Sequence, residues 1–207
     1  TVYEFLILSL VDNQANSDLI KAMKVLVPLA DGFEEMEGII IIDVLRRAGL
    51  EVRTASLKPG EVLASRKTRH IADTTIDTVR KETFDAVVLP GGAEGARNLA
   101  TNGDLADILK DLKNRNKLIG AICAAPNVLL QQGILGEQDS FTLHPGTKPD
   151  SYVGKYEPES RVVRSGDVFT SKGPGTAFEF ALNIVEELCG KEVRDKVAAP
   201  MFVLESD

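Results

Sequence analysis

Residues 24–56 read KVLVPLADGFEEMEGIIIIDVLRRAGLEVRTAS, and this stretch decides the fold class. Its apolar start, Lys24–Leu29, is typical of a short buried strand. A loop and a helix follow, and Gly49 marks the end of that helix. Val52–Ser56 then predicts a second strand. A buried strand, a helix and another strand in this order indicate a βαβ unit, whose two strands run parallel.

The rest of the chain continues this alternation. Ala86–Leu89 and Lys117–Ile122 predict two more buried strands, and Asp104–Asn114 carries apolar residues at helical spacing. The other predicted elements are short strands or a hairpin within Lys58–Asp73, a helix at Asn127–Gln132, strands at Phe141–Leu143, Arg161–Arg164 and Val168–Thr170, and a long helix at Thr176–Cys189 that ends at Gly190. We therefore predict an α/β fold with a mostly parallel central sheet.

Composition and motifs narrow the function classes. The 207 residues carry a net charge of −7, which argues against a nucleic-acid partner or an anionic membrane. Two cysteines make no disulfide framework and have no metal-type spacing, so we expect a reducing compartment and a cytoplasmic location. The chain has no P-loop, no G-x-G-x-x-G and no HExxH motif. We expect neither a cofactor nor a metal.

The first residues read differently from the rest. Residues 1–22 contain a short apolar stretch, Phe5 to Val11, that is too short to span a bilayer and lacks the features of a signal peptide. We expect an N-terminal appendage of unknown role at 1–22 and a single folding unit at 23–207. The appendage could equally reflect an upstream translation start, an artificial remnant or an extra edge element of the sheet.

Three loops leave the carboxyl ends of predicted strands, where α/β sheets bind ligands: 31–37, 90–95 and the turn at Cys123. Cys123 lies in LIGAICAAPNVLL, residues 118–130, between an apolar strand and a helix. A nucleophile has this position in a strand-to-helix elbow, where small neighbours such as Ala124 are needed and the helix end stabilises a thiolate. The G-x-C-x-G pattern is not met, and a buried structural thiol is the alternative.

Three further features qualify as candidates beside Cys123. Glu37 precedes Gly38 and four isoleucines, so its carboxyl could point inward, with a raised pKa, and share a proton with sulfur. Glu34 and Glu35, in contrast, suit a solvated face at the helix start.

His144 follows an apolar run and precedes a Pro-Gly turn, which fits either an acid/base beside Cys123 or a structural histidine. His70 is expected at the surface. The N–H groups of Gly91 and Gly92 fit an oxyanion site or an ordinary tight turn.

Five motifs in register resemble one family. They are DGFEEMEG at 31–38, VVLPGGAEGARNL at 87–99, GAICAAP at 120–126, LHP at 143–145 and SKGPGTAFEFAL at 171–182. Together they are similar to the ThiJ/PfpI family and closest to its DJ-one branch, the Parkinson-disease-associated protein deglycases. The similarity extends from residue 23 to residue 203.

The resemblance implies a flavodoxin-like three-layer sandwich, a homodimer and a cofactor-independent cysteine enzyme. It implies Cys123 as nucleophile, Glu37 as its hydrogen-bonded carboxylic acid and His144 as acid/base. The pocket residues that it implies are Gly91, Gly92, Ala124, Arg66, Gly173 and Pro174.

The implied substrates are small reactive carbonyls, or amines and thiols that glyoxals have modified. The implied alternative is an oxidative-stress sensor or redox-regulated chaperone that works through oxidation of Cys123. Peptidase-like members carry a histidine directly after the nucleophile, whereas this chain has Ala124 there, which weakens the peptidase hypothesis.

Overall fold

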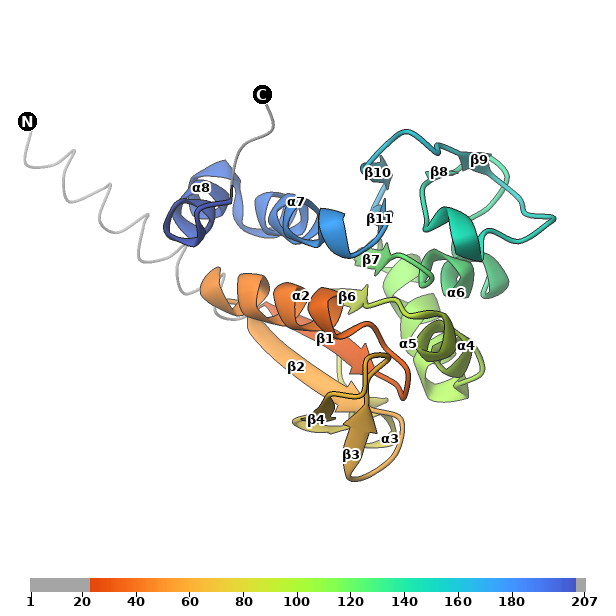
Figure 1. Cartoon of the computed structure of the whole chain (residues 1–207), viewed down its shortest axis with the longest axis horizontal. Helices are drawn as coiled ribbons and strands as arrows, with labels where there is room; N and C mark the ends of the chain where they lie inside the picture. Colours follow the sequence, from red (N-terminus) through yellow and green to blue (C-terminus); the bar gives the residue numbers. More distant parts are fainter. Residues whose placement is uncertain (1–22, 204–207) are drawn as a thin grey trace, which may run out of the picture.

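The computed structural model describes residues 23–203, and its centre is a seven-stranded sheet (Figure 1). The strands are β1 (Lys24–Leu29), β2 (Glu51–Ser56), β5 (Thr74–Thr75), β6 (Ala86–Leu89), β7 (Leu118–Ile122), β10 (Val162–Ser165) and β11 (Val168–Ser171). Their order across the sheet is β10-β11-β7-β6-β1-β2-β5. Every neighbouring pair is parallel except β10 with β11. The mostly parallel sheet predicted from the alternating elements is confirmed.

Helices cover both faces of this sheet. On one face lie α2 (Glu35–Arg47) and α7 (Ala177–Cys189), with α8 (Lys191–Ala198) packed against α7. The other face carries α3 (Ile76–Val79), α4 (Ala93–Ala100), α5 (Gly103–Asn114) and α6 (Pro126–Gln131). Strand alternation supplies both cores, because Val25 and Val27 point into one apolar cluster and Leu26 into the other. The α/β sandwich expected from the resemblance is therefore confirmed.

Helix α2 shows how local sequence sets an element. Its N-cap residue, Glu34, accepts a hydrogen bond from the Glu37 N–H at 2.8 Å. Acidic residues fill its first turn and Arg46 and Arg47 its last turn, which complements the helix dipole. Gly49, with a φ of +85°, follows the helix as predicted. This cap places Glu37 in the first turn, at the carboxyl edge of the sheet.

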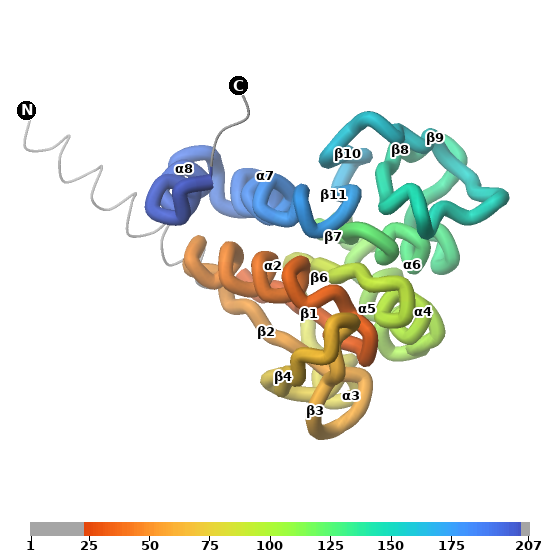
Figure 2. The backbone as a smooth tube through the Cα atoms, viewed as in Figure 1, coloured from red at the N-terminus to blue at the C-terminus, as the bar shows by residue number. Residues whose placement is uncertain are grey.

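Two small excursions leave the main sheet (Figure 2). One is the antiparallel hairpin of β3 (Glu61–Leu63) and β4 (Arg69–Ile71), which confirms the hairpin considered for this region. The other contains β8 (Ser140–Phe141), the 3-10 turn η1 (Pro145–Thr147) and β9 (Lys155–Tyr156). Two more 3-10 turns, η2 (Pro174–Thr176) and η3 (Ala199–Met201), lie before α7 and after α8.

Some elements differ from the sequence-based prediction. Helices α3, α4 and α8 were not predicted, since α3 has only four residues, α4 is rich in alanine and glycine, and α8 has few apolar residues. The strand expected at 141–143 ends at Phe141, because the chain then turns toward β7 and the His144 N–H donates to the Cys123 carbonyl. The appendage expected at 1–22 lies outside the described residues. Among residues 23–203, no helix is both long enough and apolar enough to cross a bilayer.

Candidate active site

Cys123 occupies a strained turn at the carboxyl end of β7. Its φ is +63°, a left-handed conformation that non-glycine residues rarely adopt. Two neighbouring segments hold it there: its N–H donates to the Ser171 carbonyl at 2.9 Å, and its carbonyl accepts from the His144 N–H at 2.9 Å. The side chain is 7% exposed. The fold thus stabilises a conformation that turns the sulfur away from the strand's own faces and toward the sheet edge.

Three groups surround the sulfur. The Glu37 carboxyl lies beside it from α2 and raises its pKa, while the backbone N–H groups of Gly92 and Ala124 lie beside it and lower its pKa. The Glu37 side chain is fully buried, and its Oε2 accepts from the Gly91 N–H at 2.8 Å. Glu37 Oε1 has no hydrogen-bond partner among the described residues. The arrangement joins one thiol, one carboxyl and two N–H donors at a single point.

Gly91 is the residue that allows this approach. A Cβ at this position would lie 2.5 Å from the Cys123 Cβ and 2.7 Å from both Glu37 Oε2 and the Ile122 carbonyl oxygen. Any side chain would push the thiol and the carboxyl apart. Gly92, with a φ of +86°, then turns its N–H toward the sulfur at the start of α4.

The electrostatics of the pair couple the two groups. Burial raises the pKa of Glu37 to about 7. Burial, followed by the charge of ionised Glu37, raises the pKa of the Cys123 thiol to about 12. This direction is the opposite of the stabilised thiolate expected at a helix end, because burial and the charge of the neighbouring carboxylate outweigh the effect of the backbone N–H groups. A proton on Glu37 removes that charge and makes the carboxyl a donor toward sulfur, so the thiolate forms together with neutral Glu37.

His144 borders the site with an exposed ring. Its Nδ1 accepts from the Gly146 N–H at 3.1 Å, so the neutral ring carries its proton on Nε2. A Cβ on Gly173 would lie 3.6 Å from His144 Cδ2 and 4.0 Å from Glu37 Oε1. Gly173 therefore separates the imidazole from the Glu37 carboxyl. The structure brings His144 to the rim of the site, and within residues 23–203 its ring makes no hydrogen bond to the sulfur.

The other predicted pocket residues divide into two groups. Ala124 and Gly173 are buried at the site, and Pro174 is half-buried at the start of η2 beside it. The predicted role of Arg66 in the pocket finds no contact here: its backbone N–H donates to Glu35 at the start of α2, and its guanidinium is exposed, with no ion pair in the described part of the chain.

The prediction that Glu34 and Glu35 lie on a solvated face is wrong, because both residues are buried. Glu34 caps α2, and the Glu35 carboxylate accepts hydrogen bonds from Ser65, Arg66 and Thr68 in the β3–β4 loop. These bonds outweigh the effect of burial and hold the pKa of Glu35 below its usual value. Their partners lie about thirty residues further along the chain, and a local pattern contains no signal of such contacts.

The structure thus defines a class of α/β protein. In this class a strained, buried cysteine lies beside a buried carboxyl at the carboxyl edge of a flavodoxin-like sheet. Within the described residues, no three His, Cys, Asp or Glu side chains converge on a possible metal site. The model of the DJ-1/PfpI family matches residues 23–187. The chain belongs to this family.

Several known proteins are similar to this chain over most of its length. The Parkinson disease protein 7 homolog of Danio rerio is 46% identical, over 87% of this chain and 97% of its own. The glutathione-independent glyoxalase DJR-1.2 of Caenorhabditis elegans is 41% identical, over 87% of this chain and 96% of its own. The crystal structure of Drosophila melanogaster DJ-1beta superposes with a TM-score of 0.84 at 42% identity, over 88% of this chain and 99% of its own. The structure of oxidized Toxoplasma gondii DJ-1 superposes with a TM-score of 0.81 at 40% identity, over 89% of this chain and 100% of the Toxoplasma chain.

Proposed function

We propose that this protein converts reactive carbonyls to hydroxy acids without a cofactor, with Cys123 as nucleophile and Glu37 and His144 as proton carriers. The observation that carries the proposal is the packing of the buried Cys123 side chain and the buried Glu37 carboxyl against Gly91, where a single Cβ would meet both. Membership of the DJ-1/PfpI family and a relative named as a glyoxalase support the reaction type. Small carbonyls are the proposed substrates, because Cys123 is only 7% exposed.

The proposed reaction of methylglyoxal begins at the thiolate. The Cys123 sulfur attacks the aldehyde carbon, and the oxygen that becomes negative takes the proton from neutral Glu37, giving a hemithioacetal. The N–H groups of Gly92 and Ala124, which face the sulfur, are placed to stabilise negative charge on the reacting oxygen.

An internal redox exchange completes the reaction. The Glu37 carboxylate, which the first step leaves ionised, removes the hydrogen from the carbon bonded to sulfur, and a proton is returned to the neighbouring carbonyl carbon, for which the Nε2–H of His144 is a second proton donor. The first carbon is oxidised to a thioester while the second is reduced to an alcohol, so no external oxidant or reductant is needed. Water then cleaves the thioester, which releases lactate and restores the thiol. An adduct on an amine or thiol would return that amine or thiol.

The alternative function uses the same pocket. Two donors and a protonatable carboxyl around one sulfur also suit a cysteine sulfenic or sulfinic acid, and a relative has been solved in an oxidized form. A redox sensor or redox-regulated chaperone is therefore our second proposal. A cytoplasmic location remains a prediction from cysteine usage.

The first test replaces the nucleophile. Cys123→Ala should lower lactate formation from methylglyoxal to the level of the uncatalysed reaction, whereas Cys189→Ala, the matched control in α7, should retain full activity. Circular dichroism checks that both variants fold. Retained turnover in Cys123→Ala would contradict the enzyme proposal, and intact mass after mild peroxide treatment of the wild type would then decide whether oxidation of Cys123 carries the function.

A further inference from the structure

A groove of about 760 Å³ lies between three elements on the face of the protein that carries α4 and α6. Its walls are α4, α6 and the segment 146–153, and we name it the α4–α6 groove. Neither Cys123 nor Glu37 nor His144 is among its lining residues. The chemistry proposed at the Cys123 sulfur therefore assigns this groove no role.

Hydrogen bonds between the walls hold the groove open. Gln132 Nε2 donates to the Ala100 carbonyl at 2.9 Å and joins the end of α6 to the end of α4. Asn127 Nδ2 donates to the Thr147 carbonyl at 2.9 Å and joins α6 to the segment 146–153. Walls that are fixed before a ligand arrives lose little conformational entropy when the ligand binds.

An aromatic cluster anchors the segment 146–153. The Tyr152 ring makes edge contacts with the Phe141 and Tyr156 rings, with centroids 5.5 Å and 6.0 Å away. Lys148 Nζ lies 4.8 Å from the centroid of the Tyr152 ring, which is a cation–π distance. Because Phe141 is fully buried, the cluster fixes Tyr152 as a wall of the groove.

Most of the side chains that line the groove are apolar. Ala93, Ala96 and Ala100 line it from α4, and Val128 and Leu130 line it from α6. The small side chains on α4 leave room beside the larger ones on α6. A volume of about 760 Å³ lies within the range of about 300–1,000 Å³ that is typical of sites for small organic molecules. The groove therefore suits a molecule with an apolar body.

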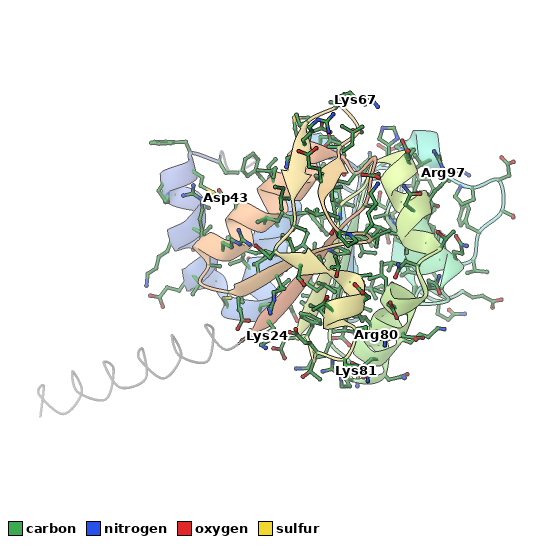
Figure 3. The ribbon with its side chains drawn as sticks, turned by 90° about the horizontal axis from the view of Figure 1, so that it is seen from below. Lys24, Asp43, Lys67, Arg80, Lys81 and Arg97 are labelled. Atoms are coloured by element: carbon green, nitrogen blue, oxygen red, sulfur yellow. The ribbon has the colours of Figure 1, made fainter. Side chains whose placement is uncertain are left out.

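One charge lies among these apolar side chains, and it is positive. The protein has 31 acidic and 24 basic residues, yet the part of 23–203 that lines the groove contains no carboxylate and only one charged side chain, Arg97. Within the described residues, the Arg97 guanidinium has neither an ion pair nor a hydrogen bond. Arg161 and Arg164, by comparison, are both paired with glutamates. An exposed, unpaired guanidinium on α4 is suited to a bidentate contact with a carboxylate (Figure 3).

The single positive charge also indicates the charge of the ligand. A carboxylate carries one negative charge, which one guanidinium can match, whereas a phosphate monoester carries nearly two. No second cation lines the groove in the described part of the chain. A monoanion is therefore the better match.

We propose that the α4–α6 groove binds a small amphipathic carboxylate, such as a medium-chain fatty acid, with its head on Arg97 and its apolar body against α6 and Tyr152. Charge complementarity at Arg97 and the fixed, mostly apolar walls select this occupant. The proposal goes beyond the carbonyl chemistry at Cys123 and does not depend on it. It assigns the protein a second site for small molecules.

Calorimetry with octanoate tests this site. In the wild type we expect octanoate to bind about tenfold more tightly than octanamide, which lacks the charge, and at least about tenfold more tightly than butyrate, which lacks four methylenes. Arg97→Gln should abolish the preference for octanoate over octanamide, and Arg97→Lys should retain part of it. Arg80→Gln is the matched control, because Arg80 is an exposed arginine that lines a different hollow (Figure 3).

Two further variants locate the bound molecule. Ala93 is an exposed residue of α4 that lines the groove, so Ala93→Leu should fill part of the space and weaken the binding of octanoate and octanamide alike. Cys123→Ala should leave the affinity for octanoate unchanged, because Cys123 does not line the groove.

Several outcomes would overturn the proposal. They are no binding of octanoate by the wild type, equal affinity for octanoate and octanamide, a preference that survives Arg97→Gln, and unchanged binding to Ala93→Leu. Tighter binding of octyl phosphate than of octanoate would overturn the assignment of a carboxylate. Loss of octanoate binding in Cys123→Ala would place the ligand at the sulfur and would equally overturn the groove as its site.

Discussion

At the scale of single residues, the burial of Glu37 lowers the free energy of unfolding near neutral pH. Its pKa rises from 4.5 to about 7 on burial, so the folded protein binds this proton more tightly than the unfolded chain does. The stabilising effect of the proton is complete below pH 4.5 and is lost as the pH rises toward 7. The difference corresponds to about 3 kcal/mol of unfolding free energy above pH 7.

Glu37→Gln should remove this pH dependence, because glutamine stays neutral and its oxygen can still accept from the Gly91 N–H. We expect the free energy of unfolding of the wild type to fall by about 2–3 kcal/mol relative to the variant between pH 4.5 and pH 8. Urea denaturation at a series of pH values measures this. Parallel stability curves for the two proteins would show that Glu37 ionises normally. The same substitution should also lower turnover, since glutamine carries no exchangeable acidic proton.

Single residues also show where sequence reasoning succeeds. The turn at Cys123 was predictable because an apolar strand, small residues and a proline follow one another locally. The sequence allowed the Glu37 side chain to point inward, because four isoleucines follow soon after it. The role of Gly91 was not predictable, since the atoms that exclude a Cβ there belong to Cys123, Glu37 and Ile122, which only the fold brings together. The catalytic roles of these residues remain predictions.

At the scale of elements, Glu35 ties the β3–β4 loop to the start of α2. Its carboxylate accepts from Ser65 Oγ at 2.9 Å, from the Arg66 N–H at 2.8 Å and from Thr68 Oγ1 at 3.1 Å. Glu35→Gln would place an amide against these donors and should destabilise the protein by about 1–3 kcal/mol. Hydrogen exchange at residues 65–68 should quicken more than exchange in β1 and β7.

Glu61→Gln is the matched control for this prediction. Glu61 belongs to the same hairpin, but it is exposed and, among residues 23–203, pairs only with Arg69, so its loss should change the unfolding free energy by less than about 0.5 kcal/mol. If Glu35→Gln and Glu61→Gln have equally small effects, the Glu35 contacts do not hold the hairpin.

Whether an element was predictable depends on the pattern of its core contacts. Strands β1, β6 and β7 are short apolar runs because helices cover both of their faces, and such runs are visible in the sequence. Helix α4 buries only alanine, glycine and one leucine, so its apolar periodicity is weak.

At the scale of the whole molecule, one surface remains unusually apolar. Met36 and Ile39 are 57% and 46% exposed on one side of α2, and Ile71 is 81% exposed on β4. The hairpin that carries Ile71 is fixed to the start of α2 through Glu35. Exposed apolar side chains of this size mark interaction surfaces, and a two-fold dimer would bury the same residues of both copies. This surface is our proposed homodimer interface.

Ile39→Lys combined with Ile71→Lys should convert a dimer into a monomer, because each new charge would be buried without a partner at the interface. Sedimentation velocity measures the change. Val153→Lys, which replaces a residue 45% exposed between β8 and β9, should leave the dimer intact. A wild type that sediments as a monomer, or a double variant that still dimerises, would contradict this interface. Helix α2 also carries Glu37. If α2 contacts the partner in the dimer, the double variant should therefore lose a larger fraction of its carbonyl turnover than of its unfolding free energy.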